Sequence, residues 1–255
     1  MRYTRAGQAD IPQLRALWQQ AFGDSDAFLD VFFATLFPRC VAFAARDGDT
    51  LCAMLYALPQ TVLTGKQEAK AAYLYAIATA AACRGRGVCR ALMQHAEKQL
   101  RSCGVTLLLL AAETPELADM YRRLGYAGSP ITFTPQRLPA PAGRAQALSP
   151  AEYAGVRETL LMDTPHIRYD KPTLDFVAQD AAYYLLETPQ LTGCAAIRRL
   201  PGGCLRADEC LPDARVLPAL SAALGPGEIL LPAQSFLFRP LDGQKDFPYA
   251  AFPLD

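Results

Sequence analysis

The sequence has no uninterrupted apolar run long enough to cross a bilayer, and its start, Met-Arg-Tyr-Thr-Arg, lacks the apolar core of a signal peptide. It also has no excess of either charge, because 25 Lys and Arg residues balance 25 Asp and Glu residues. Proteins dedicated to nucleic acids or membrane surfaces usually carry a basic excess. The composition therefore argues against a membrane or nucleic-acid partner.

The sequence is poor in metal-ligand patterns as well. Its eight cysteines include no Cys-x-x-Cys pair and no Cys/His spacing of a metal site, and only two histidines occur, His95 and His166. Neither histidine stands in a pattern that indicates catalysis. Most cysteines lie among apolar residues, which is typical of buried thiols in a reducing compartment. We expect no bound metal and a cytoplasmic location.

The length of 255 residues, 51% of them hydrophobic, exceeds that of a typical single domain. Periodicity and turn residues predict two helices, three antiparallel strands, a glycine loop, a helix, a strand and a helix, with residues 131–134 as the closing strand. Residues 135–143 are rich in Pro, Ala and Gly, which is typical of a linker. We predict a first domain over residues 1–138 and a second over residues 146–255.

The second unit begins at a capping box, Ser149-Pro-Ala-Glu152, and its expected elements follow much the same order as those of the first. A hairpin turns at Gly202-Gly203, and a strand over residues 235–239 completes the unit. A glycine loop is missing, because Leu-Pro-Asp-Ala-Arg follows Cys210. The unit is either a degenerate copy of the first, unable to hold the same ligand, or an unrelated small α+β domain.

The most informative segment is Arg84-Gly-Arg-Gly87, which lies between an apolar strand-like run and an amphipathic helix over residues 88–103. The free N–H groups and the dipole of a helix N-terminus favour an anion. Glycine lets the backbone approach a phosphate, and arginine adds charge-assisted hydrogen bonds. The segment therefore predicts a pyrophosphate site.

The common nucleotide loops do not fit this spacing. A P-loop requires a lysine and a hydroxyl residue after its second glycine, and neither follows Gly87. A Rossmann fingerprint requires a third glycine, which is absent. A nucleotide-binding switch is therefore disfavoured.

A second motif follows at a short distance. Residues 105–112 form a near-continuous apolar run, as in a strand buried on both faces, and the next helix carries Tyr121-x-x-x-Gly125-Tyr126. Together with Arg84 and Gly87, these residues resemble the GNAT superfamily of N-acetyltransferases, whose pyrophosphate loop reads Gln/Arg-x-x-Gly-x-Gly/Ala and is followed by Tyr-x-x-x-Gly-Phe/Tyr. Cys89 matches the last position of that loop only imperfectly.

The resemblance implies an α/β (α+β) GNAT fold for the first unit, in which a mixed, mostly antiparallel sheet is flanked by helices. We expect a smaller GNAT-like α+β domain to follow, with an unrelated α+β domain as the alternative. The resemblance also implies acetyl-CoA as the co-substrate, held by a strand edge, the loop and the first turn of the helix. The assigned residues are Ile77, Ala78, Thr79, Arg84, Gly85, Arg86, Gly87, Val88, Cys89, Arg90 and Thr114. An N–H near Ala78 is expected to face the thioester oxygen, whereas Thr114 has a plain helix cap as its simpler role.

The resemblance assigns Tyr121 as the acid that protonates the departing thiolate, because a phenol with a pKa of about 10 stays protonated at neutral pH. A packed core aromatic is the alternative for this tyrosine. Glu113 is the best acidic candidate for the base, although a surface ion pair explains it equally well. The terminal carboxylate of Asp255 is a further candidate by analogy with some tandem-GNAT enzymes, and an unassisted or water-relayed deprotonation stays open.

The sequence therefore predicts an N-acetyltransferase that moves an acetyl group from acetyl-CoA to a primary amine of a small molecule or peptide. The second unit is expected to shape the acceptor cleft or a homodimer contact. The alternative is a non-catalytic acyl-CoA-binding regulatory or structural protein, in which the loop binds and Tyr121 only packs.

Overall fold

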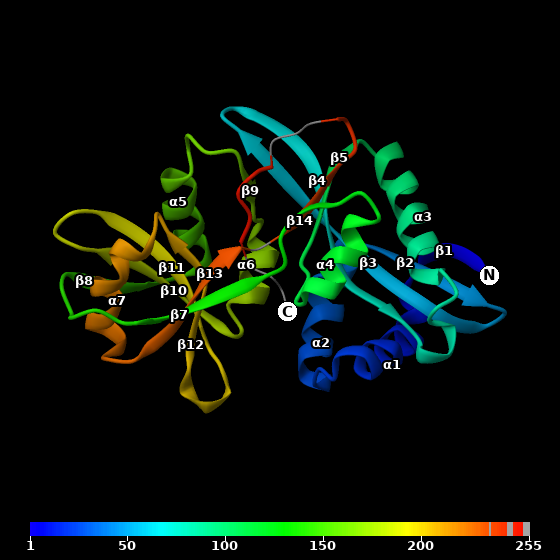
Figure 1. The fold of residues 1–255 in the computed structure, drawn as a ribbon, viewed down its shortest axis with the longest axis horizontal. Coiled ribbons are helices and arrows are strands. Elements are labelled where there is room, and N and C mark those ends of the chain that lie inside the picture. The colour runs from blue at the N-terminus through cyan, green and yellow to red at the C-terminus, as the bar shows by residue number, and fades with distance from the viewer. Residues whose placement is uncertain (235, 244–246, 252–255) are drawn as a thin grey trace.

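The computed structural model describes residues 1–234, 236–243 and 247–251. These residues form two sheets of mostly antiparallel strands, each flanked by helices (Figure 1). The mixed α/β class predicted from the sequence is confirmed. No helix within the described ranges is both long and apolar enough to span a bilayer.

The first sheet has the order β1-β2-β3-β4-β5-β14-β6, and β9 also pairs with β3. Most of its neighbouring strands are antiparallel, and β4 and β5 run parallel. The strands are β1 (Arg2–Ala6), β2 (Val41–Asp47), β3 (Thr50–Thr64), β4 (Gln67–Thr79), β5 (Val105–Leu110), β6 (Ala127–Gly128), β9 (His166–Arg168) and β14 (Leu237–Pro240).

Helices cover both faces of the first sheet. The apolar faces of α1 (Ile11–Phe22) and α2 (Asp26–Thr35) pack on one side, where Trp18 and Phe32 meet Tyr56 and Tyr75. The opposite face is covered by α3 (Val88–Ser102) and α4 (Pro115–Arg122). This two-sided burial explains why β5 is apolar along nearly its whole length.

The second sheet has the order β7-β13-β12-β11-β10-β8, with a parallel pair only between β12 and β13 among the described strands. Its strands are β7 (Thr132–Arg137), β8 (Arg144–Leu148), β10 (Ala181–Glu187), β11 (Thr192–Arg199), β12 (Leu205–Leu211) and β13 (Glu228–Gln234). The helices of this half are α5 (Pro150–Leu160), α6 (Lys171–Val177) and α7 (Leu217–Leu224). The order β8-β10-β11-β12-β13 repeats the order β1-β2-β3-β4-β5 of the first sheet, which is consistent with a second GNAT-like unit. In each sheet, the strand beside β5 or β13 comes from the other half of the chain.

The closing strands are exchanged between the halves, and here the sequence prediction is wrong. Residues 131–134 were expected to close the first sheet, but β7 pairs with β13 in the second. The strand predicted to complete the second unit, β14, instead pairs with β5 in the first (Figure 1). The reason is burial: β14 places Leu237 and Phe238 in the core, whereas β7 is mostly exposed and contains Pro135, which suits the edge of a sheet.

The two halves also share one apolar core. Phe176 of α6 lies 5.3 Å from Phe28 and 6.3 Å from Phe32 of α2, measured between ring centroids. Ion pairs at the surface join the halves at Arg39 with Asp170 and at Glu68 with Arg168. A site formed from both halves is therefore held on a continuous packed scaffold.

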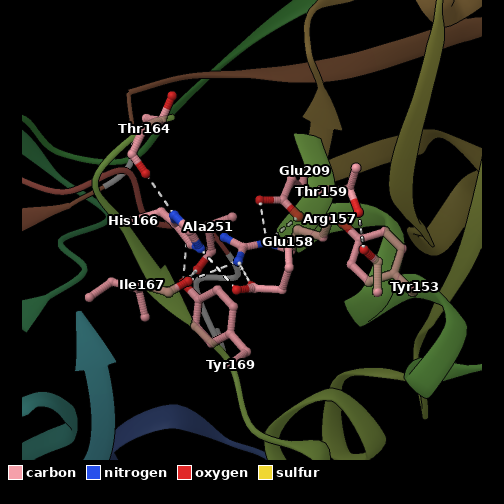
Figure 2. A network of polar contacts seen from close by, with 11 residues as sticks. Tyr153, Arg157, Glu158, Thr159, Thr164, His166, Ile167, Tyr169, Glu209 and Ala251 are labelled. Atoms are coloured by element: carbon pink, nitrogen blue, oxygen red, sulfur yellow. Dashed lines mark hydrogen bonds and ion pairs between the residues drawn. The ribbon is translucent and has the colours of Figure 1, made fainter. Parts of the chain in front are cut away.

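A buried polar network in the second half centres on Arg157 of α5 and Glu209 of β12 (Figure 2). The Arg157 Nε lies 3.0 and 2.9 Å from the two carboxylate oxygens of Glu209. The Nη1 group donates to the Ile167 carbonyl at 2.9 Å, and the Tyr153 hydroxyl donates to Glu209. The Arg157 and Glu209 side chains are 1% and 0% exposed. Because neither reaches water, each charge is compensated by the other.

The same network fixes residues 249–251. The Tyr169 ring lies 4.9 Å from the Arg157 guanidinium, and the Tyr169 hydroxyl accepts the Ala251 N–H at 2.9 Å. The Ile167 N–H donates to the Tyr249 carbonyl at 2.8 Å. This late segment is thereby tied to β9 and α5.

Candidate functional site

The centre of the site is the gap that opens between β4 and β5. These parallel strands pair from Lys70 with Val105 to Tyr73 with Leu109, and beyond Tyr73 the described part of β5 has no further partner on β4. Among the described residues, the edge of β4 at residues 77–79 therefore has no strand beside it on this side. The two parallel strands therefore splay apart at this point.

A bulge in β4 marks the start of the gap. Met54 pairs with Ala78 and Tyr56 with Tyr75, so two residues of β4 face one of β3. Ala76 adopts a φ of 46°, which costs an alanine about 1 kcal/mol. The bulge also places Tyr75 and Ala76 on the same face of the sheet. Bulges of this kind re-aim a strand next to a functional site.

The glycine loop joins β4 to α3. Gly85 and Gly87 have φ values of 72° and 74°, a region that side chains disfavour, and Gly87 is the N-cap residue of α3. The first backbone bond of the helix runs from the Ala91 N–H to the Gly87 carbonyl at 3.1 Å. The N–H groups of residues 88–90 precede that bond, and no side chain caps this end among the described residues.

The two loop arginines lie differently. The Arg84 Nε donates to the Thr79 carbonyl at 3.1 Å, so this side chain braces the end of β4. The Arg86 guanidinium is exposed and lies 3.8 Å from the Asp47 carboxylate, too far for more than a weak pair. Open N–H groups beside an exposed cation fit a pyrophosphate, as the acetyl-CoA expectation requires.

Two further loop and helix positions have ordinary roles. Burial raises the pKa of the Cys89 thiol, so the helix N-terminus does not make this cysteine a ready thiolate. The Thr114 hydroxyl accepts the Leu117 N–H at 3.3 Å, which makes it the N-cap of α4. Thr114 thus has the helix-cap role that the sequence offers as its simpler alternative.

A cavity of about 110 Å³ occupies the gap. Ile77, Glu113 and Tyr121 all line it, so the structure brings the two predicted catalytic residues to one place. Tyr121 is also 6% exposed and packs 6.0 Å from Tyr126, so its ring belongs to the core while part of it faces the cavity. We call this cavity the channel.

A larger cavity of about 370 Å³ adjoins the channel, and we call it the acceptor cavity. The two share four lining residues: Phe22, Tyr75, Ala76 and Glu113. Trp18, Asp24 and Phe28 line only the larger one, together with Asp180 and Arg198 from the second half.

Asp24, Asp180 and Arg198 belong to no motif of the sequence that indicates a functional site. Single acidic or basic residues in loops and strands carry no local signal of a shared cavity. The Trp18 indole N–H donates to Asp24 at 2.7 Å, and the Arg198 Nη1 lies 3.0 Å from Asp180. Only packing of the second half against α1 and α2 brings these groups together.

The corresponding position of the second half differs. The parallel pair of β12 and β13 ends at Arg206 with Leu230, and a cavity of about 470 Å³ lies at that splay. Where the first half has its glycine loop, the Asp213 carboxylate accepts the Arg215 N–H at 2.9 Å. Hydrogen bonds from the Arg215 side chain lower the pKa of Asp213 to about 2. The Asp213 carboxylate, ion-paired with the Arg215 side chain, therefore already occupies a backbone N–H group that a phosphate would need at this turn.

The other residues singled out in the sequence lie partly at the donor site and partly away from it. Ala78 and Thr79 lie on β4 beyond the splay, and Val88 and Arg90 lie in the first turn of α3. His95 packs near Tyr3 and Phe43, away from the channel. Asp255 lies outside the described residues.

Comparisons with known proteins agree with this geometry. The model of the acetyltransferase (GNAT) domain family matches residues 2–128. A search of curated proteins found no match to the sequence.

Solved structures share the fold over nearly the whole chain. A GCN5-related N-acetyltransferase from Anabaena variabilis has a TM-score of 0.73 at 14% identity, covering 94% of this chain and 73% of that chain. A GCN5-related N-acetyltransferase from Kribbella flavida has a TM-score of 0.71 at 16% identity, covering 94% and 72%. Eis1 from Mycobacterium abscessus has a TM-score of 0.64 at 17% identity, covering 95% and 67%.

The splayed parallel strands, the glycine loop at a helix N-terminus and the family match all fall within the same segment of the chain. With this domain at its N-terminal end, the chain belongs to the GNAT superfamily and is an acyltransferase.

Proposed function

We propose that the protein transfers an acetyl group from acetyl-CoA to a primary amine of a small molecule or peptide. The observation that carries this proposal is the junction at Glu113, where the channel between β4 and β5 opens into the acceptor cavity. A donor in the channel and an acceptor in the larger cavity meet there. Such placement converts a bimolecular reaction into an effectively unimolecular one.

The donor would be held by backbone more than by side chains. The edge of β4 at Ile77, Ala78 and Thr79 would bond the pantetheine chain, and the backbone N–H groups of residues 84–90 would bind the pyrophosphate. Arg86 adds an exposed cation beside it. When bound, acetyl-CoA supplies the activated acetyl group as a thioester, and an N–H near Ala78 is placed to polarise the thioester carbonyl.

The chemistry requires one proton to leave the amine and one to reach the sulfur. Glu113, which no described residue pairs with, accepts the proton as the nitrogen forms the amide bond. Tyr121 donates its phenolic proton to the sulfur as the carbon–sulfur bond breaks. Both residues line the channel. Glu113 lies on the segment between β5 and α4, and Tyr121 lies near the C-terminal end of α4.

A Tyr121→Phe variant tests the acid role. We expect kcat to fall about 100-fold, the lower end of the usual contribution of a general acid, with little change in the Kd of CoA. The measurement is thiol release from acetyl-CoA with a confirmed acceptor, beside calorimetric CoA binding. An unchanged kcat would remove the acid role from Tyr121.

Binding without turnover would instead favour a non-catalytic acyl-CoA-binding protein. The same calorimetry on the wild-type chain decides this. CoA binding together with no thiol release from a broad amine panel contradicts the proposed transfer. Absence of CoA binding contradicts both the transfer and the binding-only alternative.

A further inference from the structure

The charge balance of the acceptor cavity indicates what kind of amine it takes. Its charged side chains are Asp24, Glu113, Asp180 and Arg198. Arg198 is already neutralised, because its Nη1 lies 3.0 Å from Asp180 and its Nη2 lies 3.0 Å from the fully buried Asp208. The cavity therefore offers no cation to an acidic acceptor.

The aspartates on that side are compensated as well. Arg206 lies 2.8 Å from Asp208, so that Arg198 and Arg206 together balance Asp180 and Asp208. Asp24 and Glu113 have no cationic partner among the described residues. Two uncompensated negative charges remain in one cavity, and such a site concentrates cations.

These two carboxylates lie at different parts of the cavity. Glu113 lines both the channel and the acceptor cavity, so it marks the point of transfer. Asp24 lines only the acceptor cavity, on the segment between α1 and α2. One oxygen of Asp24 accepts the Trp18 indole N–H at 2.7 Å, which fixes the carboxylate and leaves its other oxygen for a ligand.

The walls between them are aromatic. Trp18, Phe22, Phe28 and Tyr75 all line the cavity. Aromatic faces accept an aliphatic chain by burial and a cationic nitrogen through their π-electrons. The volume of about 370 Å³ is at the lower end of small-molecule sites.

Building on the proposed acetyl transfer, we propose that the acceptor is an aliphatic diamine or polyamine. One nitrogen lies at Glu113, loses a proton there and is acetylated. A second nitrogen stays protonated and is held by Asp24 against the aromatic walls. The transfer joins the acetyl carbon to the first nitrogen and releases CoA as its thiol, so the second nitrogen keeps its charge throughout.

Three acceptors of equal chain length separate the possibilities: 1,4-diaminobutane, 1-aminobutane and 4-aminobutanoate. Their far ends are cationic, neutral and anionic. With acetyl-CoA and a thiol-detecting assay, we expect kcat/KM for the diamine to exceed that of the monoamine at least about tenfold, which corresponds to about 1.4 kcal/mol. The anionic acceptor is expected to be the poorest of the three.

An Asp24→Asn variant then tests the residue. Asparagine keeps an oxygen for the Trp18 indole, so the fold of this segment is retained. We expect KM for 1,4-diaminobutane to rise about tenfold with kcat retained, while the kinetics of 1-aminobutane stay unchanged. Glu116→Gln is the matched control, because it removes an exposed charge in the first turn of α4 that lines neither cavity.

The outcomes separate the two proposals. Thiol release at equal kcat/KM for diamine and monoamine, or an equal effect of Asp24→Asn on both, overturns the diamine assignment while acetyl transfer stands. A preference for 4-aminobutanoate or for a peptide α-amine overturns it as well. No thiol release from any of these amines also overturns the diamine assignment, whereas CoA binding with no thiol release from the broad amine panel overturns the proposed transfer itself.

Discussion

The buried pair of Arg157 and Glu209 gives the sharpest stability prediction. A Glu209→Gln change keeps the size of the side chain but removes the charge that compensates Arg157, whose own side chain is 1% exposed. Breaking a buried ion pair from one side costs about 3–5 kcal/mol. The total free energy of unfolding of a native protein is only about 5–15 kcal/mol. The variant should therefore lose about a fifth or more of its free energy of unfolding.

The geometry explains why relaxation cannot recover this loss. The Arg157 Nε uses both oxygens of Glu209, and the Arg157 Nη2 already has no hydrogen-bond partner among the described residues. The Tyr153 hydroxyl depends on the same carboxylate. At about 2–4 °C per kcal/mol for a chain of this size, the expected fall in Tm is roughly 6–20 °C.

Thermal and urea unfolding followed by far-UV circular dichroism measure the effect. Glu158→Gln is the matched control, because Glu158 also contacts Arg157, at 3.3 Å, but its side chain is 30% exposed. We expect that control to lose about 1 kcal/mol or less. Arg157→Met completes a cycle with Glu209→Gln, with a coupling of about 1–3 kcal/mol. Equal losses for Glu209→Gln and Glu158→Gln, or no coupling, would refute the reasoning.

Three further predictions concern the glycine loop, the first turn of α3 and the corresponding turn of the second half. Gly87→Ala places a side chain at a φ of 74° where nothing lies within 4 Å, so the change adds only backbone strain of about 1 kcal/mol. Calorimetry should then show CoA binding severalfold weaker. Unchanged affinity would show that binding does not need this backbone conformation. Burial raises the pKa of the Cys89 thiol, so at pH 7.5 iodoacetamide should alkylate the exposed Cys103 before Cys89. Peptide mass spectrometry measures the order of alkylation, and alkylation of Cys89 first would contradict the burial argument. Because the Asp213 carboxylate already binds the Arg215 N–H at the corresponding turn of the second half, titration should show one CoA per chain. Two CoA per chain would contradict this reasoning.

Local sequence determined most of the elements and the donor half of the site. The α3 helix begins after Gly87 and ends before Gly104, as the glycines and the apolar periodicity predict. Thr114 caps α4, and the capping box of Ser149 with Glu152 opens α5. These features depend on neighbours a few residues apart, so a linear pattern contains their full physical cause.

Tertiary structure decided which strand closes which sheet and what the acceptor meets. Strand patterns specify a pleated, partly buried segment but not its partner, and the place beside β5 went to β14, which can be buried, while β7 took an edge. The acceptor cavity joins Asp24 to Asp180 across more than half of the chain. No periodic or motif signal links such positions, because only the packed interface between the two halves sets their distance.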